Sequence, residues 1–403
     1  MFNKKICVMG LGYIGLPTAA ILATKGYNVI GVDISQSLVN TISKGEINIL
    51  EPDLDIVVKS AINSNKLKVS LTPEEADVFF ISVPTPFKES YKPDISYIES
   101  ATKSILPYLR KGNLVILEST SPIGTTEYIG ELLKESRLNI GKELFIAHAP
   151  ERVLLGHTLK EIIENDRIIG GVNKKSSEVC KKFYNTFVKG EIFITDAKTA
   201  ELTKLVENSY RDVNIAFANE LDNICSKLDV NVWELIKLAN KHPRVNILSP
   251  GPGVGGHCLA VDPWFIVDAA KDEAKLIKRA RITNEARPDI ITKRVLIHAN
   301  RFKKPVVGAL GISYKPDIDD IRESPALEVV EKLSKLDSIE LLVHDPYIKS
   351  HKHLNFKTDD LNTIIEKSDI LVLLVHHKEY FKIDKSRLRE KILIDTRGIW
   401  ESN

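Results

Sequence analysis

The sequence has few cysteines and no long apolar run, and both shortages narrow what it can encode. Four cysteines occur among 403 residues, far apart from one another. Zinc sites are usually built from closely spaced pairs of cysteine and histidine, so this spacing predicts no metal centre. The longest apolar runs, "VFFISV" and "ILVLLV", have six residues each, whereas a helix needs about 20 to cross a bilayer. We therefore predict no membrane span.

The sequence also lacks a strong charge of either sign. Its formal net charge is +2, and so small a total gives no support to nucleic-acid binding, which usually needs a basic surface. The opening "MFNKKICVMGLGYIG" has the pattern of a strand and a turn rather than of a signal peptide. We expect a cytoplasmic protein whose cysteines stay reduced.

What is present is a globular composition in a long chain. Hydrophobic residues make up 43% and charged residues 27% of the sequence, which is typical of a soluble globular protein. Because a single core stops growing near about 250 to 300 residues, the 403 residues predict two or three domains.

The first 35 residues have the pattern of a dinucleotide-binding βαβ unit. "KKICVMGLGYIGLPTAAILATKGYNVIGVDIS" predicts a strand, a glycine turn, an amphipathic helix and a second strand. Gly10, Gly12 and Gly15 have the GxGxxG spacing that brings a backbone close to a pyrophosphate. Asp33 closes the second strand, where a carboxylate binds a ribose 2′-hydroxyl and repels a 2′-phosphate, which favours NAD. The alternative is a glycine-rich turn that binds nothing.

Three more buried-strand patterns follow at "ADVFFISVPTP", "NLVILEST" and "LFIAHAPER". Each ends in small or polar residues, as strands do where their carboxyl ends meet a ligand. Thr85 and Thr120 lie at two of these ends. Either threonine could contact a cofactor or simply begin a turn.

A long helix and a second strand series follow. Residues 199–228 have a helical pattern without glycine or proline, which suggests a connecting or dimer-forming helix. After about residue 300, "KKPVVGALGISYK", "IELLVHDPY" and "SDILVLLVHHKEY" echo segments of the first domain. We predict an α/β protein with two Rossmann-like doubly wound domains joined by a long central helix. The predicted segments are 1–197, which binds NAD, 198–298, which is helical and holds a catalytic loop, and 299–403.

The loop "PGPGVGGHCLAVDPW" contains the one cysteine without a sheltered position. Cys7 lies in a strand pattern, and Cys180 and Cys225 lie in helical patterns, where thiols act as small hydrophobic groups. Cys258 instead precedes Asp262-Pro263, which predicts an N-cap followed by the first helical residue. A thiol near a helix start could be a nucleophile, or it could only pack on the loop. Asp262 could be no more than the cap.

On the long helix, Lys204, Asn208 and Arg211 share one side. They could form a polar site or a solvated stripe opposite Leu202, Val206 and Val213. A nicotinamide site together with a reactive cysteine suggests a four-electron oxidation. An alcohol is oxidised to an aldehyde, the thiolate adds to it, the thiohemiacetal is oxidised to a thioester, and hydrolysis releases an acid with two NADH formed.

These motifs resemble the UDP-glucose/GDP-mannose dehydrogenase family along essentially the whole chain. The resemblance rests on "GLGYIGLPTA", "ESTSPIGTT", "APERVLLG", "TKLVENSYRDVNIAFANEL", "NKHPRVN", "GPGVGGHCLAVDPW", "GISYKPDIDDIRESP" and "DTRGIW". The family oxidises the C6 alcohol of a nucleotide sugar to an acid. "GGHCLAVDPW" resembles the branch acting on UDP-N-acetylhexosamines, because UDP-glucose members more often have lysine where this chain has Val261. "NKHPRVNIL" and "ENSYRDVNIAFANEL" resemble members that oxidise UDP-N-acetyl-D-mannosamine, with the glucosamine and galactosamine epimers as alternatives.

The resemblance implies a role for each matching catalytic residue. Cys258 matches the nucleophile, and Lys204 and Asn208 match the pair that stabilises the oxyanion on its adduct. Asp262 matches a carboxylate that assists proton transfer, Glu151 a glutamate linked to thioester hydrolysis, and Thr120 a threonine beside it and the nicotinamide. Lys204 could instead be a general base for the first oxidation.

The resemblance also implies the binding residues and a homodimer. The implied NAD contacts are Gly10, Gly12, Tyr13, Ile14, Gly15, Asp33, Thr85, Thr120 and Arg322. The implied sugar-nucleotide contacts are Arg152, Val153, Lys204, Asn208, Arg211, His242, Arg244, Gly255, Tyr314, Lys315 and Arg397. In the family the arginine that matches Arg244 comes from the neighbouring subunit. Two more distant readings are a single-step β-hydroxyacid dehydrogenase, which needs no Cys258, and a dinucleotide sensor without catalysis.

Overall fold

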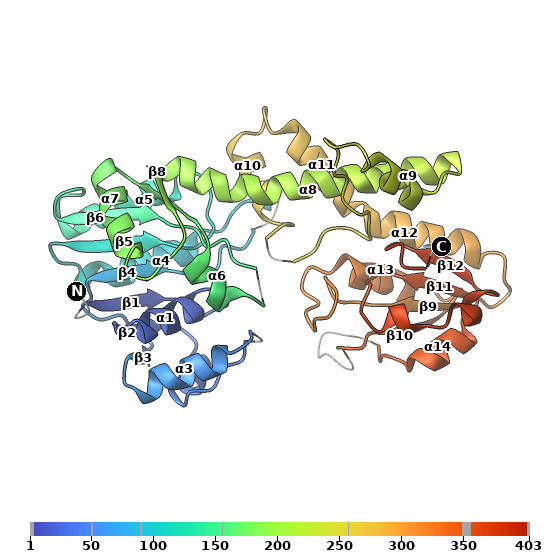
Figure 1. The fold of residues 1–403 in the computed structure, drawn as a ribbon, viewed down its shortest axis with the longest axis horizontal. Coiled ribbons are helices and arrows are strands. Elements are labelled where there is room, and N and C mark those ends of the chain that lie inside the picture. Colours follow the sequence, from blue (N-terminus) through green and yellow to red (C-terminus); the bar gives the residue numbers. More distant parts are fainter. Residues whose placement is uncertain are drawn as a thin grey trace. The chain divides into compact units, whose positions relative to one another are not determined.

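The structure, a computed structural model, describes residues 4–49, 51–88, 91–154, 156–256, 258–348 and 356–400. It consists of two compact units, Met1–Val206 and Glu207–Asn403. Each unit contains a largely parallel sheet, and the helix α8 (Ala197–Leu228) is the longest element (Figure 1). The α/β class with two Rossmann-like sheets and a long central helix is therefore confirmed. The exact three-segment division stays a prediction.

In the described part of the first unit, the sheet has the order β3-β2-β1-β4-β5-β6-β7-β8. Its neighbouring strands are parallel except for β6 and β7. The order of the first six strands is that of a dinucleotide-binding fold, whose ligand crevice lies where the order reverses, between β1 and β4. The strands are β1 (Lys5–Met9), β2 (Asn28–Val32), β3 (Leu67–Ser70), β4 (Val78–Ile81), β5 (Asn113–Leu117), β6 (Leu144–His148), β7 (Arg167–Gly171) and β8 (Ile192–Asp196).

Helices cover both faces of this sheet (Figure 1). Ile6 and Val8 of β1 pack into one core with α1, and Cys7 and Met9 pack into a second core with α4. Alternate residues of a strand point to opposite faces, so a strand buried on both sides must be apolar throughout, as β1 is. The helices are α1 (Gly15–Thr24), α2 (Gln36–Ser43), α3 (Leu54–Asn63), α4 (Ser96–Ile105), α5 (Thr125–Leu133), α6 (Thr158–Glu164) and α7 (Lys174–Tyr184).

In the described part of the second unit, a four-stranded parallel sheet has the order β10-β9-β11-β12. α12 and α13 pack on one face, and α14 packs on the other. The strands are β9 (Val306–Leu310), β10 (Glu340–His344), β11 (Ile370–Leu373) and β12 (Ile392–Asp395). The helices after α8 are α9 (Val232–Ala239), α10 (Asp262–Ala269), α11 (Lys275–Glu285), α12 (Arg287–Ala299), α13 (Pro325–Ser334) and α14 (Leu361–Lys367).

The long helix α8 buries several polar residues and exposes several apolar ones. Ser209 and Asp212 are 3% and 0% exposed, whereas Leu202 and Val206 are 39% and 47% exposed. One alternative from the sequence was a solvated polar stripe opposite a buried apolar side formed by Leu202, Val206 and Val213. That alternative is wrong for Leu202 and Val206, because both are exposed. The buried charge of Asp212 is compensated by an ion pair, as burial of charge requires. Asp212 pairs with buried Arg281 at 2.7 Å.

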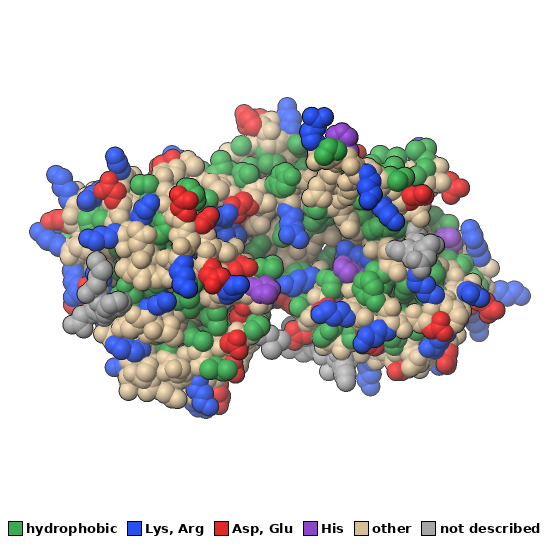
Figure 2. Space-filling model, viewed as in Figure 1, with side chains coloured by type: hydrophobic (Ala, Val, Ile, Leu, Met, Phe, Trp, Pro, Cys, Tyr) green, Lys and Arg blue, Asp and Glu red, His purple; other side chains and the backbone are tan. Residues whose placement is uncertain are grey.

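The charge distribution, the helices and the side chains able to bind metal each bear on whether the protein binds a ligand or a membrane. On the face drawn in Figure 2, basic and acidic side chains are interspersed over each unit. Among the residues that the structure describes, no helix combines the length and apolar character needed to cross a bilayer. The same residues contain no group of three or more histidine, cysteine or acidic side chains arranged to hold a metal ion.

Candidate active site

The glycine turn of the first unit leaves room for a ligand beside the start of α1. Gly10 has φ +93°, and a Cβ there would lie 2.5 Å from the carbonyl oxygen of Ser82, so only glycine fits. A Cβ on Gly12 would meet nothing within 4 Å. Tyr13 and Ile14 directly precede α1, which begins at Gly15 with Ile14 as its N-cap and no side-chain cap. The first N–H groups of a helix have no acceptor within that helix. This edge of the sheet therefore suits a phosphate group.

Asp33 lies directly after β2, as the sequence predicts. Its Oδ2 accepts the N–H of Leu11 at 3.0 Å, and its Oδ1 accepts the N–H of Ser35 at 2.9 Å. A carboxylate has about four acceptor positions, so two stay available to a ribose. Together with the glycine turn, this half-buried carboxylate fits NAD.

The two predicted strand-end threonines come together. Thr85 donates from Oγ1 to the carbonyl oxygen of Thr120 at 2.6 Å. Both residues are half-buried, and they follow the adjacent strands β4 and β5. The contact joins the two loops at the carboxyl edge of the sheet, which is where the nicotinamide half of a dinucleotide is expected.

Glu151 belongs to a buried ion pair that the sequence analysis missed. Its Oε2 lies 2.5 Å from Nη1 of Arg167, and both side chains are at most 4% exposed. Oε1 accepts the N–H of Arg152 at 2.8 Å. Arg167 opens the apolar strand β7, and an arginine at the start of a buried strand is a signal that could have pointed to a partner carboxylate.

A second buried carboxyl group, Glu118, lies near this pair. It is 3% exposed and accepts hydrogen bonds from Ser82 at 2.5 Å and Thr18 at 3.2 Å. Burial, with the negative charge of Glu151, raises the pKa of Glu118 to about 8. The group is therefore mostly protonated at neutral pH. Sequence reasoning gave it no role.

Lys204 is half-buried on α8 and lies close enough to His148 to affect its titration. Burial, together with the charge of Lys204, lowers the pKa of His148 to about 3, so the imidazole is neutral at physiological pH. Among the described residues, neither ring nitrogen of this fully buried histidine has a hydrogen-bond partner.

In the second unit, Cys258, Asp262 and Asn208 are brought together. The carbonyl oxygen of Cys258 accepts the N–H of Asp262 at 2.8 Å. Asp262 Oδ2 in turn accepts a hydrogen bond from Nδ2 of Asn208 at 2.5 Å. Cys258 is exposed, whereas the other three cysteines are buried, as predicted. An exposed thiol thus lies one turn from a carboxylate that is 2% exposed.

The prediction that Asp262 is an N-cap is wrong. α10 begins at Asp262, Val261 is the capping residue, and no side chain caps the helix. Pro263 is accordingly the second helical residue rather than the first. The physical reason is that the Asp262 carboxylate bonds to Asn208 instead of turning back to the first N–H groups of its own helix. Asp262 therefore holds Asn208 in place.

The glycine loop before Cys258 is anchored through Gly251. Its N–H donates to Oδ1 of Asn219 at 2.8 Å, and its carbonyl oxygen accepts Nε of Arg287 at 2.8 Å. Arg287 is 1% exposed and also pairs with Asp222 at 2.6 Å. Sequence reasoning missed these anchors, because a charged residue in an amphipathic helix pattern usually indicates a solvated face.

Gly255 and Gly256 lie against the loop that contains the predicted substrate residues Tyr314 and Lys315. A Cβ on Gly255 would lie 2.2 Å from the carbonyl oxygen of Glu323, so the close approach requires glycine. A Cβ on Gly256 would lie 3.0 Å from Cε2 of Tyr314. Lys315 places Nζ 5.8 Å from the centre of the Tyr314 ring. The structure thus joins the thiol loop to this segment.

Arg397 presents a cation beside the same loop. A Cβ on Gly251 would lie 2.5 Å from its Nη1. Its Nε donates to the carbonyl oxygen of Leu374 at 2.8 Å. Burial, with the nearby charge of Arg287, lowers the pKa of Arg397 to about 10. The charge of Arg287 is compensated by Asp222, so Arg397 is the cation of the two that suits an anionic ligand such as a diphosphate.

The remaining predicted residues lie at more exposed positions. Arg322 is paired with Asp320, Nη2 to Oδ2, at 2.5 Å. His242 and Arg244 are exposed after α9, Arg211 is exposed on α8, and Arg152 reaches the carbonyl oxygen of Asp166 at 3.4 Å. Val153 packs against the core of the first unit.

Comparisons with known proteins agree in one family. Residues 4–188, 198–286 and 308–402 match the NAD binding, central and UDP binding domains of the UDP-glucose/GDP-mannose dehydrogenase family. The chain is 51% identical to an NDP-N-acetyl-D-galactosaminuronic acid dehydrogenase of Ralstonia nicotianae, over 99% of this chain and 97% of that protein. It is 51% identical to the UDP-N-acetyl-D-mannosamine dehydrogenase of Campylobacter jejuni, over 96% and 98%. The solved UDP-D-ManNAc dehydrogenase of Pyrococcus horikoshii has a TM-score of 0.90 at 42% identity, covering 98% of this chain and 96% of that chain.

Proposed function

The chain belongs to the UDP-glucose/GDP-mannose dehydrogenase family, and on this premise we propose that it oxidises UDP-N-acetyl-D-mannosamine at C6 to the uronic acid, with NAD as the cofactor. The observation that carries the proposal is the group in the second unit. An exposed thiol, Cys258, is followed by a turn to Asp262, whose carboxylate binds Asn208. A one-step alcohol dehydrogenase has no use for this thiol.

The chemistry needs a nucleophile because the second oxidation starts from an aldehyde. NAD, when bound, would supply the hydride acceptor for both oxidations, so two NADH would be formed for each acid. The Cys258 thiolate forms a C–S bond to the aldehyde carbon, and the resulting thiohemiacetal is oxidised to a thioester. Water then breaks the C–S bond, which releases the acid and returns the thiol.

The neighbouring polar groups have distinct proposed roles. Asn208, held by Asp262, donates to the oxyanion that forms when the thiolate adds. Lys204 lies four residues, about one helical turn, before Asn208 on α8 and stabilises the same charge as an ammonium. Glu151, held by Arg167, directs the water that hydrolyses the thioester. Thr120 joins the nicotinamide side through its contact with Thr85.

The binding residues are proposed from the same structure. Gly10, Gly12, Gly15 and Asp33 hold NAD, because they combine an open glycine turn with a half-buried carboxylate. Tyr314 and Arg397 lie against the glycine loop, and Lys315 lies beside the Tyr314 ring. These three residues hold the UDP-sugar, whose diphosphate matches the cations. Arg152, Val153, Arg211, His242, Arg244 and Arg322 complete the proposed contacts.

The sugar is proposed from Val261 and from relatives such as the 51% identical mannosamine enzyme of Campylobacter jejuni. A second candidate is UDP-N-acetylgalactosamine, which is favoured by the equally similar galactosaminuronic acid enzyme of Ralstonia nicotianae. The glucosamine epimer would need the same catalytic residues. We propose that the acid enters surface polysaccharide, and that the protein is cytoplasmic, since all four cysteines are without disulfides.

A panel of purified UDP-N-acetylhexosamines tests both the reaction and the sugar. NADH is followed by absorbance, and the product is identified by mass spectrometry. We expect two NADH for each uronic acid, with the highest kcat/KM for the mannosamine epimer. One NADH for each substrate consumed would contradict the thioester route. Tight NAD binding without any acid product would instead favour a dinucleotide sensor.

We also propose a homodimer that forms through the apolar face of α8. Helical periodicity puts its exposed apolar residues on one side, and a second copy of the same helix would cover them. They are Leu202, Val206, Tyr210, Phe217, Ile224 and Leu228. Replacing Phe217, 52% exposed, by glutamate should give a monomer in sedimentation analysis. A dimer that persists in Phe217→Glu and Tyr210→Glu would rule out this face.

A further inference from the structure

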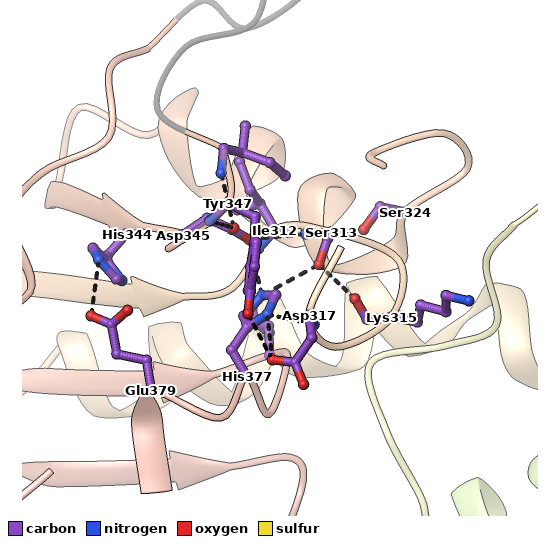
Figure 3. Close-up of polar contacts among 12 residues, drawn as sticks. Ile312, Ser313, Lys315, Asp317, Ser324, His344, Asp345, Tyr347, His377 and Glu379 are labelled. Atoms are coloured by element: carbon purple, nitrogen blue, oxygen red, sulfur yellow. Dashed lines mark hydrogen bonds and ion pairs between the residues drawn. The ribbon is translucent and has the colours of Figure 1, made fainter. Parts of the chain in front are cut away.

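The switch point of the second sheet is filled by a buried imidazole. This point lies between β9 and β11, and His377, in the loop after β11, is 0% exposed there. Nδ1 accepts the N–H of Asp317 at 2.9 Å, so the ring proton lies on Nε2. Nε2 is 3.2 Å from Oδ2 of Asp345 and 3.3 Å from Oγ of Ser313 (Figure 3).

This ring holds both ends of the segment 313–317. At one end, Ser313 donates its hydroxyl proton to the carbonyl oxygen of Lys315 at 2.8 Å, which leaves Oγ to accept from Nε2. At the other end, Asp317 is attached through its N–H and has φ +61°. Tyr314 and Lys315 lie between the two attachments (Figure 3 labels Lys315). The imidazole therefore helps to set the path of the backbone that carries them, together with the N–H of Tyr314, which donates to the carbonyl oxygen of Asp320 at 3.0 Å.

Tyr314 contacts the glycine loop that leads to Cys258. A Cβ on Gly255 would lie 3.1 Å from Cβ of Tyr314, and one on Gly256 would lie 3.0 Å from Cε2 of its ring. The loop backbone is therefore in contact with the tyrosine on two successive residues. Cys258 follows Gly256 by two residues, so a shift of Tyr314 would move the thiol.

We propose that His377 is a positioning residue for the reaction. By holding Ser313 and Asp317, it fixes Tyr314 against the glycine loop and so fixes the Cys258 thiol. It acts through other residues and touches none of the reacting atoms. The catalytic consequence rests on the proposed function, whereas the structural consequence does not.

Three substitutions separate the two attachments. His377→Leu removes both attachments and also the contact with Asp345. His377→Gln keeps a donor near the Nε2 position, and His377→Asn keeps an acceptor near the Nδ1 position. A displacement of about 1 Å costs on the order of 100-fold in rate, so His377→Leu should lower kcat by about 10- to 100-fold. The Gln and Asn variants should each recover at least about threefold of that loss. The Kd for NAD, most of whose proposed contacts lie in the first unit, should change by less than about twofold.

A histidine in the same unit provides a matched control. His344 is hydrogen-bonded to the Tyr380 hydroxyl at 3.0 Å, and Figure 3 shows it directed toward Glu379. Its side chain makes none of the bonds that hold the segment 313–317. His344→Leu should therefore keep kcat within about twofold of wild type while losing a comparable hydrogen bond.

Amide hydrogen exchange gives a readout that needs no substrate. In His377→Leu, residues 258–262 and 312–317 should exchange at least about tenfold faster than in wild type, and in His344→Leu they should not. Wild-type kcat in His377→Leu, or a loss of kcat without faster exchange at residues 258–262, would overturn the positioning role. If His377→Leu does not fold, the Gln and Asn variants decide by the same readouts. A wild-type protein that oxidises no UDP-sugar would refute the proposed function, and the exchange result would still test the role of His377.

Discussion

Both sheets have the same turn after their first strand. Gly10 donates its N–H to Val32 at 2.7 Å in the first unit, and Gly311 donates to His344 at 2.8 Å in the second. The next N–H bonds to the acidic residue that follows the second strand, Asp33 at 3.0 Å and Asp345 at 2.8 Å. Up to this point the two copies agree in both sequence and geometry.

The copies then differ in what occupies the crevice. Gly12 leaves open space, whereas its counterpart Ser313 lies 3.3 Å from His377. Asp33 is half-buried, whereas Asp345 is 2% exposed and has His377 against it. The second crevice is thus filled by the side chain of His377. Shared topology predicts where a crevice lies, and the side chains decide whether a ligand or the protein fills it.

The strands beside the two crevices differ in the same sense. Glu118 follows β5 in the first unit and has a pKa raised to about 8 by burial and by Glu151. The matching residue after β12 is Thr396, whose hydroxyl donates to Leu373 at 2.7 Å. At this matching position the first sheet thus has a carboxyl group, Glu118, and the second sheet has a hydroxyl group, Thr396, which does not titrate near neutral pH.

The largest expected effect separates the two units by function. Cys258→Ser should lower acid formation by at least about 1000-fold, because a serine hydroxyl is far less ionised and less nucleophilic than a thiol. NAD binding to the first unit should stay within about twofold of wild type. Mass spectrometry of the product and titration with NAD measure the two quantities. Acid formation at the wild-type rate would refute the thioester route.

Glu118→Gln tests the titratable difference. Between pH 4.5 and about 8, the native state keeps the Glu118 proton that the unfolded state releases, so raising the pH through this window destabilises the first unit. The slope is about 1 kcal/mol per pH unit and should disappear in the glutamine variant. Amide exchange of β1 and β5 reports it, with β9 and β11 as the internal control. An unchanged slope in the variant would mean that Glu118 is not the titrating group.

A matched pair of substitutions tests whether only one crevice binds a ligand. Asp33→Ala should weaken NAD binding by about 10- to 100-fold and relax the preference over NADP, because a ribose ligand is lost. Asp345→Ala should leave NAD affinity unchanged and lower the free energy of unfolding by about 2 kcal/mol, because buried N–H groups lose their acceptor. Isothermal titration and chemical denaturation measure these effects. An NADP preference unchanged by Asp33→Ala would show that another residue reads the ribose.

The smallest expected effect concerns the residue that matches His377. Thr85→Val removes the hydrogen bond to Thr120 and should raise the KM for NAD by about two- to fivefold, since one neutral hydrogen bond is worth about 1 kcal/mol. The KM for the sugar should not change. Thr102→Val, in which a helical hydroxyl bond is lost far from the loops, is the control. An equal change in both variants would remove the case for Thr85.

The sequence predicted the features that depend on residues near one another in the chain. The glycine turn, Asp33 after β2, the buried cysteines and exposed Cys258 all follow from local spacing and strand pattern. Family resemblance implied catalytic roles for Asn208 and Asp262, but their contact was not predicted, because 54 positions separate the two residues. Local rules instead made Asp262 a helix cap, which the structure corrects.

The buried polar pairs could not be predicted, because they depend on which elements pack together. Arg167 meets Glu151 only once β7 is in place beside β6. His377 meets Asp345 only when loops after two different strands are brought together. Charged residues in a sequence are normally predicted to be exposed to solvent. That prediction fails where two polar residues pair with each other inside the protein.

The buried polar residues of α8 restrict how the helix is positioned along its axis against the segments that it packs on. An apolar face tolerates sliding, because one leucine replaces another, whereas a buried ion pair matches in a single register. If α8 slipped by one turn, about 5.4 Å, Asp212 would lose Arg281, and Asn219 would lose Gly251. Both charges of the first pair would then be buried without compensation. These buried polar contacts thus fix the axial position of α8 and keep Asn208 beside Asp262.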